Sequence, residues 1–354
     1  DRPLLDVPLV GRAADLDWVR QVTGDRLLVG QPGSGKTFLL HKLVREDKAL
    51  FVNSSDRGEI ADSLRSQHPH IIIADDAQNY RELLRDLRQM REELGIVFYI
   101  IASCWPGDRN AIAHILNLPE AHIRELELLT RDEIVQVINS AGLYGPNQLV
   151  REIVDQAEGR PGLAVTLAQL CLHGGAHEVA LGDSLRQSFL SFFEPIVGQR
   201  ASLILATISV SGDAGMMMRG VANALGLSLA DVQNAVIQLA AGGVVFDLDE
   251  QRLSVRPPTL RYVLIRDVFF RGAVSFPIEL VLDQVSDLEE AALSIIGAKA
   301  RGAVMPASLL ISLVEQTASP KVFEAYASLG PDETRWILQR WPEALTAAIH
   351  PALH

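Results

Sequence analysis

Apolar residues follow two different patterns along this chain, and the pattern changes near residue 130. In the first part, short runs that are almost wholly apolar alternate with stretches of helical spacing. Such runs are typical of parallel strands that are buried on both faces of a sheet. The pattern predicts an α/β domain with a five-stranded parallel sheet, whose strands lie at 27–29, 49–52, 70–74, 96–102 and 123–126.

From residue 130 onward the apolar spacing is helical. Thr130 and Glu133 stand three residues apart in the pattern of a capping box, which predicts the start of a helix. Further helices are expected at 149–157 and 163–172. Together they predict a small helical lid at the edge of the sheet.

Residues 200–270 contain three predicted helices followed by a predicted hairpin. The third helix covers 229–241 with Ser228 as its N-cap, and the hairpin covers 244–255, with its tip at Asp249 and Glu250. This order is typical of a winged helix-turn-helix. After it come short helices punctuated by prolines, the first opened by a capping box of Ser286 and Glu289, as in an α-solenoid.

These changes in pattern predict four parts. We expect a nucleotide-binding domain at 1–128, a helical lid at 129–195, a winged-helix domain at 196–275 and a helical segment at 276–354. Because the chain begins without methionine and its last predicted helix runs to the end, we expect it to be a piece of a longer protein.

The stretch after the first strand carries the main candidate chemistry. Gly30, Gly35, Lys36 and Thr37 fill the pattern G-x-x-x-x-G-K-[ST] of a phosphate-binding P-loop. A glycine-rich loop can turn its N–H groups toward a phosphate, and the helix that follows adds its positive end. A chance glycine-rich turn is the alternative, but a strand precedes the loop and a helix follows it. The predicted nucleotide-binding residues are Gly30, Pro32, Gly33, Ser34, Gly35, Lys36, Thr37 and Phe38.

A second acidic motif ends the third predicted strand. His70 to Ala74 is an apolar run that is followed directly by Asp75 and Asp76, the Walker B pattern. An acid at this edge of the sheet reaches the magnesium ion, and the next acid can activate the attacking water. We therefore assign Thr37 and Asp75 to Mg²⁺ and Asp76 to catalysis; an ordinary strand that ends in an acidic turn is the alternative.

Polar residues after the fourth predicted strand are weaker candidates. Ser103, at the tip of that strand, is a candidate sensor of the γ-phosphate and is counted with Lys36 and Asp76 as catalytic. Arg109 fits a surface loop better. Cys104 is expected to be a structural thiol, and the group around Cys171 lacks the spacing of a zinc site because two glycines interrupt it.

Charge and cysteine content narrow the class of protein. The 354 residues carry a net charge of -12, which argues against a general nucleic-acid binder. The third helix of the predicted winged helix has no lysine or arginine, so nucleic acid is an unlikely partner. Two cysteines and no long apolar run predict a cytoplasmic protein with no membrane span.

The order of these motifs resembles the STAND class of NTPases, which are AAA+-related signalling switches that include NB-ARC and NACHT proteins. The resemblance covers about residues 8–270 and rests on the P-loop, Asp75-Asp76, a lid with Gly-x-Pro and a winged helix. It implies that Val10, Gly11 and Arg12 form the adenine-side edge of the site and that Pro161 packs on the adenine. Two departures are the sequence Ser103-Cys104-Trp105, where relatives often carry an arginine, and the lack of a histidine near Arg256.

What the resemblance implies for function is an ATP/ADP switch. Members hold ADP in a closed monomer, exchange it for ATP when they sense a trigger, and then self-associate to engage an effector protein, often in cell-death or antiviral defence. A slow ATPase activity is expected. The alternatives are an AAA+ DNA-handling ATPase and a transcription regulator that binds DNA through the winged helix.

Overall fold

The computed structural model describes residues 8–46, 49–52, 56–198, 200–248, 252–271 and 275–342. The chain divides into two compact units. The first comprises residues 1–172 with 241–243, and the second comprises 173–240 with 244–354. The predicted boundary at 128 therefore falls inside the first unit. The predicted wing tip at Asp249 and Glu250 and the end of the last predicted helix lie outside the described residues.

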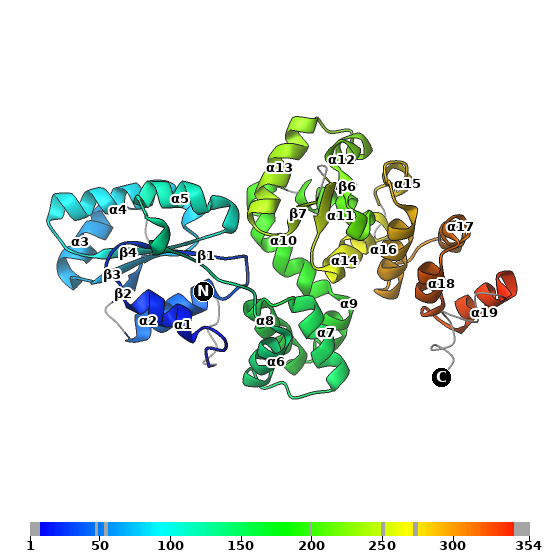
Figure 1. Cartoon of the computed structure of the whole chain (residues 1–354), viewed down its shortest axis with the longest axis horizontal. Helices are drawn as coiled ribbons and strands as arrows, with labels where there is room; N and C mark the ends of the chain where they lie inside the picture. Colours follow the sequence, from blue (N-terminus) through cyan, green and yellow to red (C-terminus); the bar gives the residue numbers. More distant parts are fainter. Residues whose placement is uncertain are drawn as a thin grey trace. The chain divides into compact units, whose positions relative to one another are not determined.

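A five-stranded parallel sheet forms the centre of the first unit (Figure 1). Its strand order is β2-β3-β4-β1-β5, so β1 lies between β4 and β5 while β3 lies on the other side of β4. All four pairings are parallel. The strands are β1 (Arg26–Val29), β2 (Ala49–Phe51), β3 (Ile71–Ala74), β4 (Tyr99–Cys104) and β5 (Ile123–Glu125).

Helices cover both faces of this sheet because every parallel pairing needs a crossover connection. Apolar side chains of α3, α4 and α5 pack on one face, and those of α1 and α2 pack on the other. The helices are α1 (Ala13–Arg20), α2 (Lys36–Glu46), α3 (Arg57–Gln67), α4 (Arg81–Leu94) and α5 (Arg109–Leu116).

Strand β4 lies two to three residues later than predicted. The prediction of 96–102 followed the apolar run, but the strand covers 99–104. Phe98 lies just before it, buried, with its carbonyl accepting from Arg91. The Ser103 hydroxyl hydrogen-bonds to Asp75 and Asp76 at the carboxyl edge of the sheet. Because it has these partners, a polar side chain can lie in a buried strand. Ser103 and Cys104 are therefore part of the strand and not of the loop after it.

Three helices after β5 complete the first unit. They are α6 (Arg131–Ser140), α7 (Asn147–Ala157) and α8 (Pro161–Leu172). The predicted capping box is confirmed: the Thr130 hydroxyl accepts from the Glu133 N–H, and the Glu133 carboxylate accepts from the Thr130 N–H. The three helices pack on one another as the predicted lid.

The second unit contains the predicted three helices and hairpin. Ser228 caps the third helix by accepting from the Asp231 N–H at 3.1 Å. The short strand β6 (Met216–Met217), which was not predicted, joins the hairpin as a third strand. The core elements are α11 (Arg200–Val210), α12 (Met218–Leu225), α13 (Leu229–Ala241), β7 (Val245–Leu248), β8 (Arg252–Val255) and α14 (Pro258–Phe269), preceded by α9 (Ala176–Leu181) and α10 (Asp183–Val197).

Short helices follow to the end of the described residues. The predicted capping box at Ser286 is wrong, because the Asp287 carboxylate caps the helix by accepting from the Glu290 N–H. Asp287 is the better acceptor because it directly precedes the first helical residue. These helices are α15 (Glu279–Leu282), α16 (Leu288–Ala300), α17 (Ala307–Thr317), α18 (Pro320–Ala327) and α19 (Pro331–Arg340).

The predicted fold class is confirmed. A loop of the P-loop type connects β1 to α2 in a parallel five-stranded sheet, and helical domains follow it, so the chain has a P-loop NTPase fold. Among the described residues, no single helix has the length and apolar character to cross a membrane. Within the described ranges, one bent pair of helices, α12 and α13 taken together, reaches that composition, and a 120° bend separates the two.

Candidate nucleotide site

The P-loop occupies residues 30–35, between the buried strand β1 and the first turn of α2. Gly33 and Gly35 have φ values of 78° and 96°, in the region that favours glycine. A Cβ placed on Gly30 would stand 2.6 Å from Ser34 Oγ, so the loop closes tightly on itself at that point. The glycines of the motif therefore serve the turn itself, as the pattern predicts.

Lys36 directs its ammonium group back into the loop. Its Nζ donates to the carbonyl oxygens of Gly30 at 2.7 Å and Gln31 at 3.2 Å, and the residue is only 5 % exposed. A positive charge is thereby held at the centre of a concave backbone loop, beside the start of α2. A phosphate group is the ligand that this combination of lysine, loop and helix end suits best.

Thr37 and Asp75 meet at the carboxyl ends of β1 and β3. The Thr37 hydroxyl donates to Asp75 Oδ2 at 2.6 Å, although the two residues are 38 positions apart in the sequence. A hydroxyl and a carboxylate side by side are the hard oxygen donors that Mg²⁺ prefers. The chemistry of this donor set therefore fits a magnesium ion, which Thr37 and Asp75 would hold.

Ser103 joins both acidic residues from the neighbouring strand β4. Its hydroxyl donates to Asp75 Oδ1 and accepts from the Asp76 N–H at 3.0 Å. The side chain is fully buried. In this arrangement Ser103 hydrogen-bonds to both acidic residues, and its predicted role as a sensor of the γ-phosphate stays a prediction.

Asp76 turns the chain out of the sheet. Its φ of 49° lies in the left-handed region, and it precedes the short 3₁₀ helix η1 (Ala77–Asn79). The Asp76 carboxylate accepts from Gln78 at 3.4 Å and is half-buried. At this turn the two adjacent carboxylates have different partners: Asp75 accepts from Thr37 and Ser103, whereas Asp76 accepts from Gln78. The two acids can therefore have different chemical roles.

The lid lies directly against the P-loop. The N–H of Gly162, in the first turn of α8, donates to the Gly33 carbonyl at 2.9 Å. A Cβ placed on Gly35 would stand 3.3 Å from Pro161 Cγ. Pro161 therefore contacts the loop, and its predicted packing on adenine stays a prediction.

Arg160 is a member of this region that the sequence did not point to. It is 2 % exposed, and its Nη2 donates to Gln31 Oε1 of the P-loop at 2.7 Å while Nη1 donates to Glu158 at 3.2 Å. Burial lowers the pKa of Arg160 from its ordinary value. The Gly-Arg-Pro sequence could have indicated Arg160, but only its proline was assigned to the nucleotide site.

The segment before α1 also reaches the site. Val10 is half-buried and Gly11 is exposed, and the Arg12 guanidinium is buried behind the loop, where it donates to the Ser34 carbonyl at 3.2 Å. Pro32 is buried, and Phe38 lies half-buried on α2 with the Lys42 ammonium 5.5 Å from its ring.

The remaining candidates fall outside the site's chemistry. Cys104 is fully buried, and burial raises the pKa of its thiol to about 12. Arg109 begins helix α5 and does not lie in the loop that the sequence suggested; it pairs with the exposed Glu120. In the part of the chain that the structure describes, no group of three His, Cys, Asp or Glu side chains could hold a metal ion.

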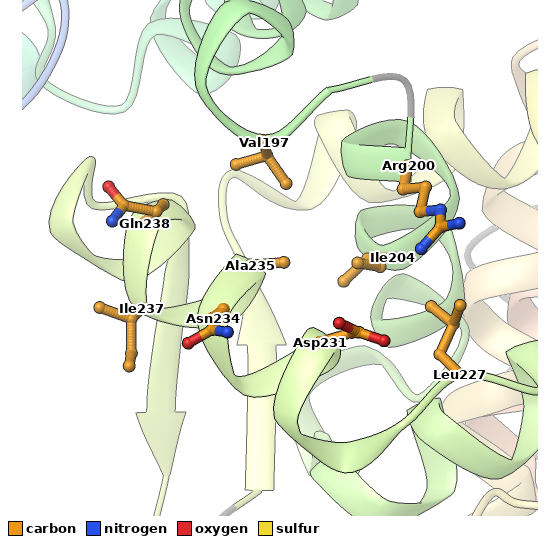
Figure 2. A pocket seen from close by; sticks show the side chains of 9 residues that line it. All are labelled: Val197, Arg200, Ile204, Leu227, Asp231, Asn234, Ala235, Ile237 and Gln238. Atoms are coloured by element: carbon orange, nitrogen blue, oxygen red, sulfur yellow. The ribbon is translucent and has the colours of Figure 1, made fainter.

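A separate hollow of about 380 Å³ lies in the second unit, between the start of α11 and the helix α13 (Figure 2). The side chains of Arg200 and Asp231 and the apolar side chains of Ile204 and Leu227 line it together. None of the residues of the predicted nucleotide site belongs to it.

Comparison with known proteins gives structural likeness only. No protein-family model and no curated protein matches the sequence. Among solved structures, Cdc6p from Pyrobaculum aerophilum is 15 % identical with a TM-score of 0.38, over 80 % of this chain and 97 % of its own. The Orc1 protein of Aeropyrum pernix, solved in complex with DNA, is 13 % identical with a TM-score of 0.37, over 75 % and 94 %.

A STAND protein with a tetratricopeptide repeat sensor, from Pyrococcus horikoshii, also matches. It is 16 % identical with a TM-score of 0.32, and the match covers 99 % of this chain and 56 % of that protein. Scores of this size do not distinguish a signalling ATPase from a DNA-handling one.

Proposed function

We propose that this chain is an ATP- and ADP-binding regulatory switch of the STAND class, which couples nucleotide exchange or slow hydrolysis to self-association. The observation that carries the proposal is the hydrogen bond between Thr37 and Asp75 beside the P-loop lysine. It joins the phosphate-binding half of the site to the metal-binding half.

Each residue has a role in this proposal. Lys36 and the loop N–H groups bind the phosphates, and Thr37 and Asp75 hold Mg²⁺, which would neutralise charge on the phosphates. Asp76 orients or deprotonates the attacking water. Ser103 would position Asp75 and Asp76, and Val10, Gly11 and Pro161 would contact the base.

The contact between lid and loop supports a switch over a simple hydrolase. Gly162 donates to the P-loop carbonyl of Gly33, and Arg160 donates to Gln31 of the same loop. A nucleotide that changes the conformation of the P-loop must therefore either move the lid as well or break these hydrogen bonds at a cost in free energy. A protein trigger and an effector, in signalling or defence, are part of the proposal through the resemblance alone.

Particle size with different nucleotides tests the proposal. The protein is measured by light scattering after loading with ADP and then with a non-hydrolysable ATP analogue, beside Lys36→Ala as the control. We expect a monomer with ADP and a larger particle with the analogue, in the wild type only. An identical size in both states, despite measured binding of both nucleotides, would contradict the switch.

The second candidate function is DNA handling, and the order of α11, α12, α13 and the β7–β8 hairpin favours it. The described face of α13 opposes it, because its exposed polar side chains are Asp231, Gln233, Asn234 and Gln238. A gel shift at two salt concentrations separates the two functions, since contacts with phosphates weaken as salt rises.

A further inference from the structure

The guanidinium group of Arg12 joins two parts of the first unit that are far apart in the sequence. One nitrogen, Nη2, donates to the Ser34 carbonyl at 3.2 Å and to the Glu127 carbonyl at 2.5 Å. Ser34 belongs to the P-loop, and Glu127 belongs to the connection between β5 and the lid helix α6. A single buried group thus holds the loop and the lid connection together.

The position of Arg12 is fixed from its other side. Its Nη1 lies 3.4 Å from the Asp15 carboxylate, which also accepts from Arg124 Nε at 2.6 Å. Arg12 is 5 % exposed, so its bonds to the two carbonyls are shielded from water. A planar guanidinium that is held by a carboxylate keeps its donors in a set direction.

The chain next to Arg12 packs directly against the lid. Gly11 has a φ of 66°, and a Cβ placed on it would stand 2.6 Å from the Glu133 carboxylate and 2.8 Å from Leu129. Leu129 in turn donates its N–H to the Gly159 carbonyl at 2.8 Å, just before Arg160 and Pro161. The lid connection is therefore held between the Gly11–Arg12 segment and the start of α8.

From this geometry we infer that Arg12 is a positioning residue of the phosphate site. It fixes the position of the P-loop relative to the lid connection. Its side chain acts on the phosphate half of the site through the Ser34 carbonyl, and not on the base. The inference rests on the proposed nucleotide-binding function.

Tripolyphosphate tests the inference because it carries phosphates but no base. Wild type, Arg12→Lys and Arg12→Gln are titrated with ATP and with tripolyphosphate. Neither variant has a guanidinium that is held by the Asp15 carboxylate through Nη1 while Nη2 donates to both carbonyls. We therefore expect affinity for both ligands to fall by the same factor, about tenfold. Arg124→Gln is the matched control, since it also loses a bond to Asp15 but does not touch the loop.

Three results would overturn the inference: a loss confined to ATP, no loss for either ligand, or an equal loss in Arg124→Gln. Failure of the wild type to bind either ligand would instead refute the proposed function, so the two failures are distinguishable. If the variants do not fold, hydrogen exchange of the wild type still tests the inference. Tripolyphosphate should slow hydrogen exchange of the amides at 127–133, and unchanged exchange there during saturated binding would also overturn the inference.

Discussion

The carboxyl edge of the parallel sheet and the helix α13 both carry several polar side chains, and they differ in what surrounds those side chains. At the sheet edge, Thr37, Asp75 and Ser103 are at least half-buried and hydrogen-bond to one another. On α13, Gln233 and Asn234 are exposed. A buried polar group must find a partner, so its neighbours are fixed by the fold, whereas an exposed group is satisfied by water. Chemistry is therefore easier to infer from the first arrangement than from the second.

The largest expected effect separates the two acids at the sheet edge. Asp76→Asn should slow single-turnover ATP hydrolysis by about 10²–10⁴-fold, because only the activation of water is lost. Its ATP affinity should change little. Asp75→Asn is the companion variant, and it should weaken Mg²⁺-dependent binding because a charged oxygen is lost from the metal's surroundings. The reverse pattern, with normal hydrolysis in Asp75→Asn, would mean that the roles are exchanged.

Lys36→Ala should lower ATP affinity by roughly one hundredfold, since a charge-assisted bond to phosphate is removed from a buried site. Isothermal titration calorimetry measures the change. Lys42→Ala, on the next turn of the same helix, removes an equal charge outside the loop and serves as the control. Equal affinities in wild type and Lys36→Ala would refute the assignment of the P-loop.

Ser103→Ala should raise the Mg²⁺ concentration needed for half-maximal nucleotide binding by about tenfold, because Asp75 and the Asp76 N–H each lose a partner. The shift should be similar with ADP and ATP. A residue that sensed only the γ-phosphate would affect ATP alone, so the pair of Mg²⁺ titrations distinguishes the two roles. Ser103→Thr, which keeps the hydroxyl, should recover part of the loss.

Ser228→Ala probes a polar contact in the other region. Loss of the N-cap of α13 should lower the free energy of unfolding by about 1 kcal/mol. ATP affinity should not change, because the cap serves the helix and Ser228 is not among the residues that we propose to bind nucleotide. Chemical denaturation followed by fluorescence measures the first effect. A change in nucleotide affinity would contradict the expectation that polar contacts of α13 affect stability alone.

The smallest effect is expected when duplex DNA is added. Without cations on α13, the protein should bind random DNA no tighter than about 10⁻⁴ to 10⁻⁶ M at physiological salt. Fluorescence anisotropy with a labelled duplex tests this expectation. A sequence-selective complex in the nanomolar range would make α13 a reading helix despite its neutral face.

The sequence predicted those elements best that depend on residues close to one another along the chain. The P-loop, the capping box at Thr130 and the helix at 229–241 depend on local spacing, and the structure has each of them where it was expected. Strand β4 was misplaced because its apolar run begins before the strand does, and the pairing with β1 and β3 decides where the strand lies. Such pairing joins residues some 28 to 75 positions apart, beyond the reach of any local pattern.

The site was predicted as separate motifs and not as an assembly. Walker patterns named Thr37 and Asp75, but nothing local indicates that Ser103 would stand between Asp75 and Asp76. Arg160 and Gln31 are 129 positions apart, and their bond follows only from the packing of the lid on the loop. Long-range hydrogen bonds of this kind depend on tertiary packing, which a single sequence does not display.

The burial of Cys104 has a practical consequence for labelling. Burial raises the pKa of the Cys104 thiol to about 12, so the reactive thiolate is scarce near neutral pH, and the side chain is fully buried. Cys171 is the chain's other cysteine, and it lies half-buried on the lid helix α8. A maleimide dye should therefore attach to this chain mainly at Cys171, with little reaction at Cys104 in the sheet. A fluorophore at that position would test whether the lid helix moves when a nucleotide is added.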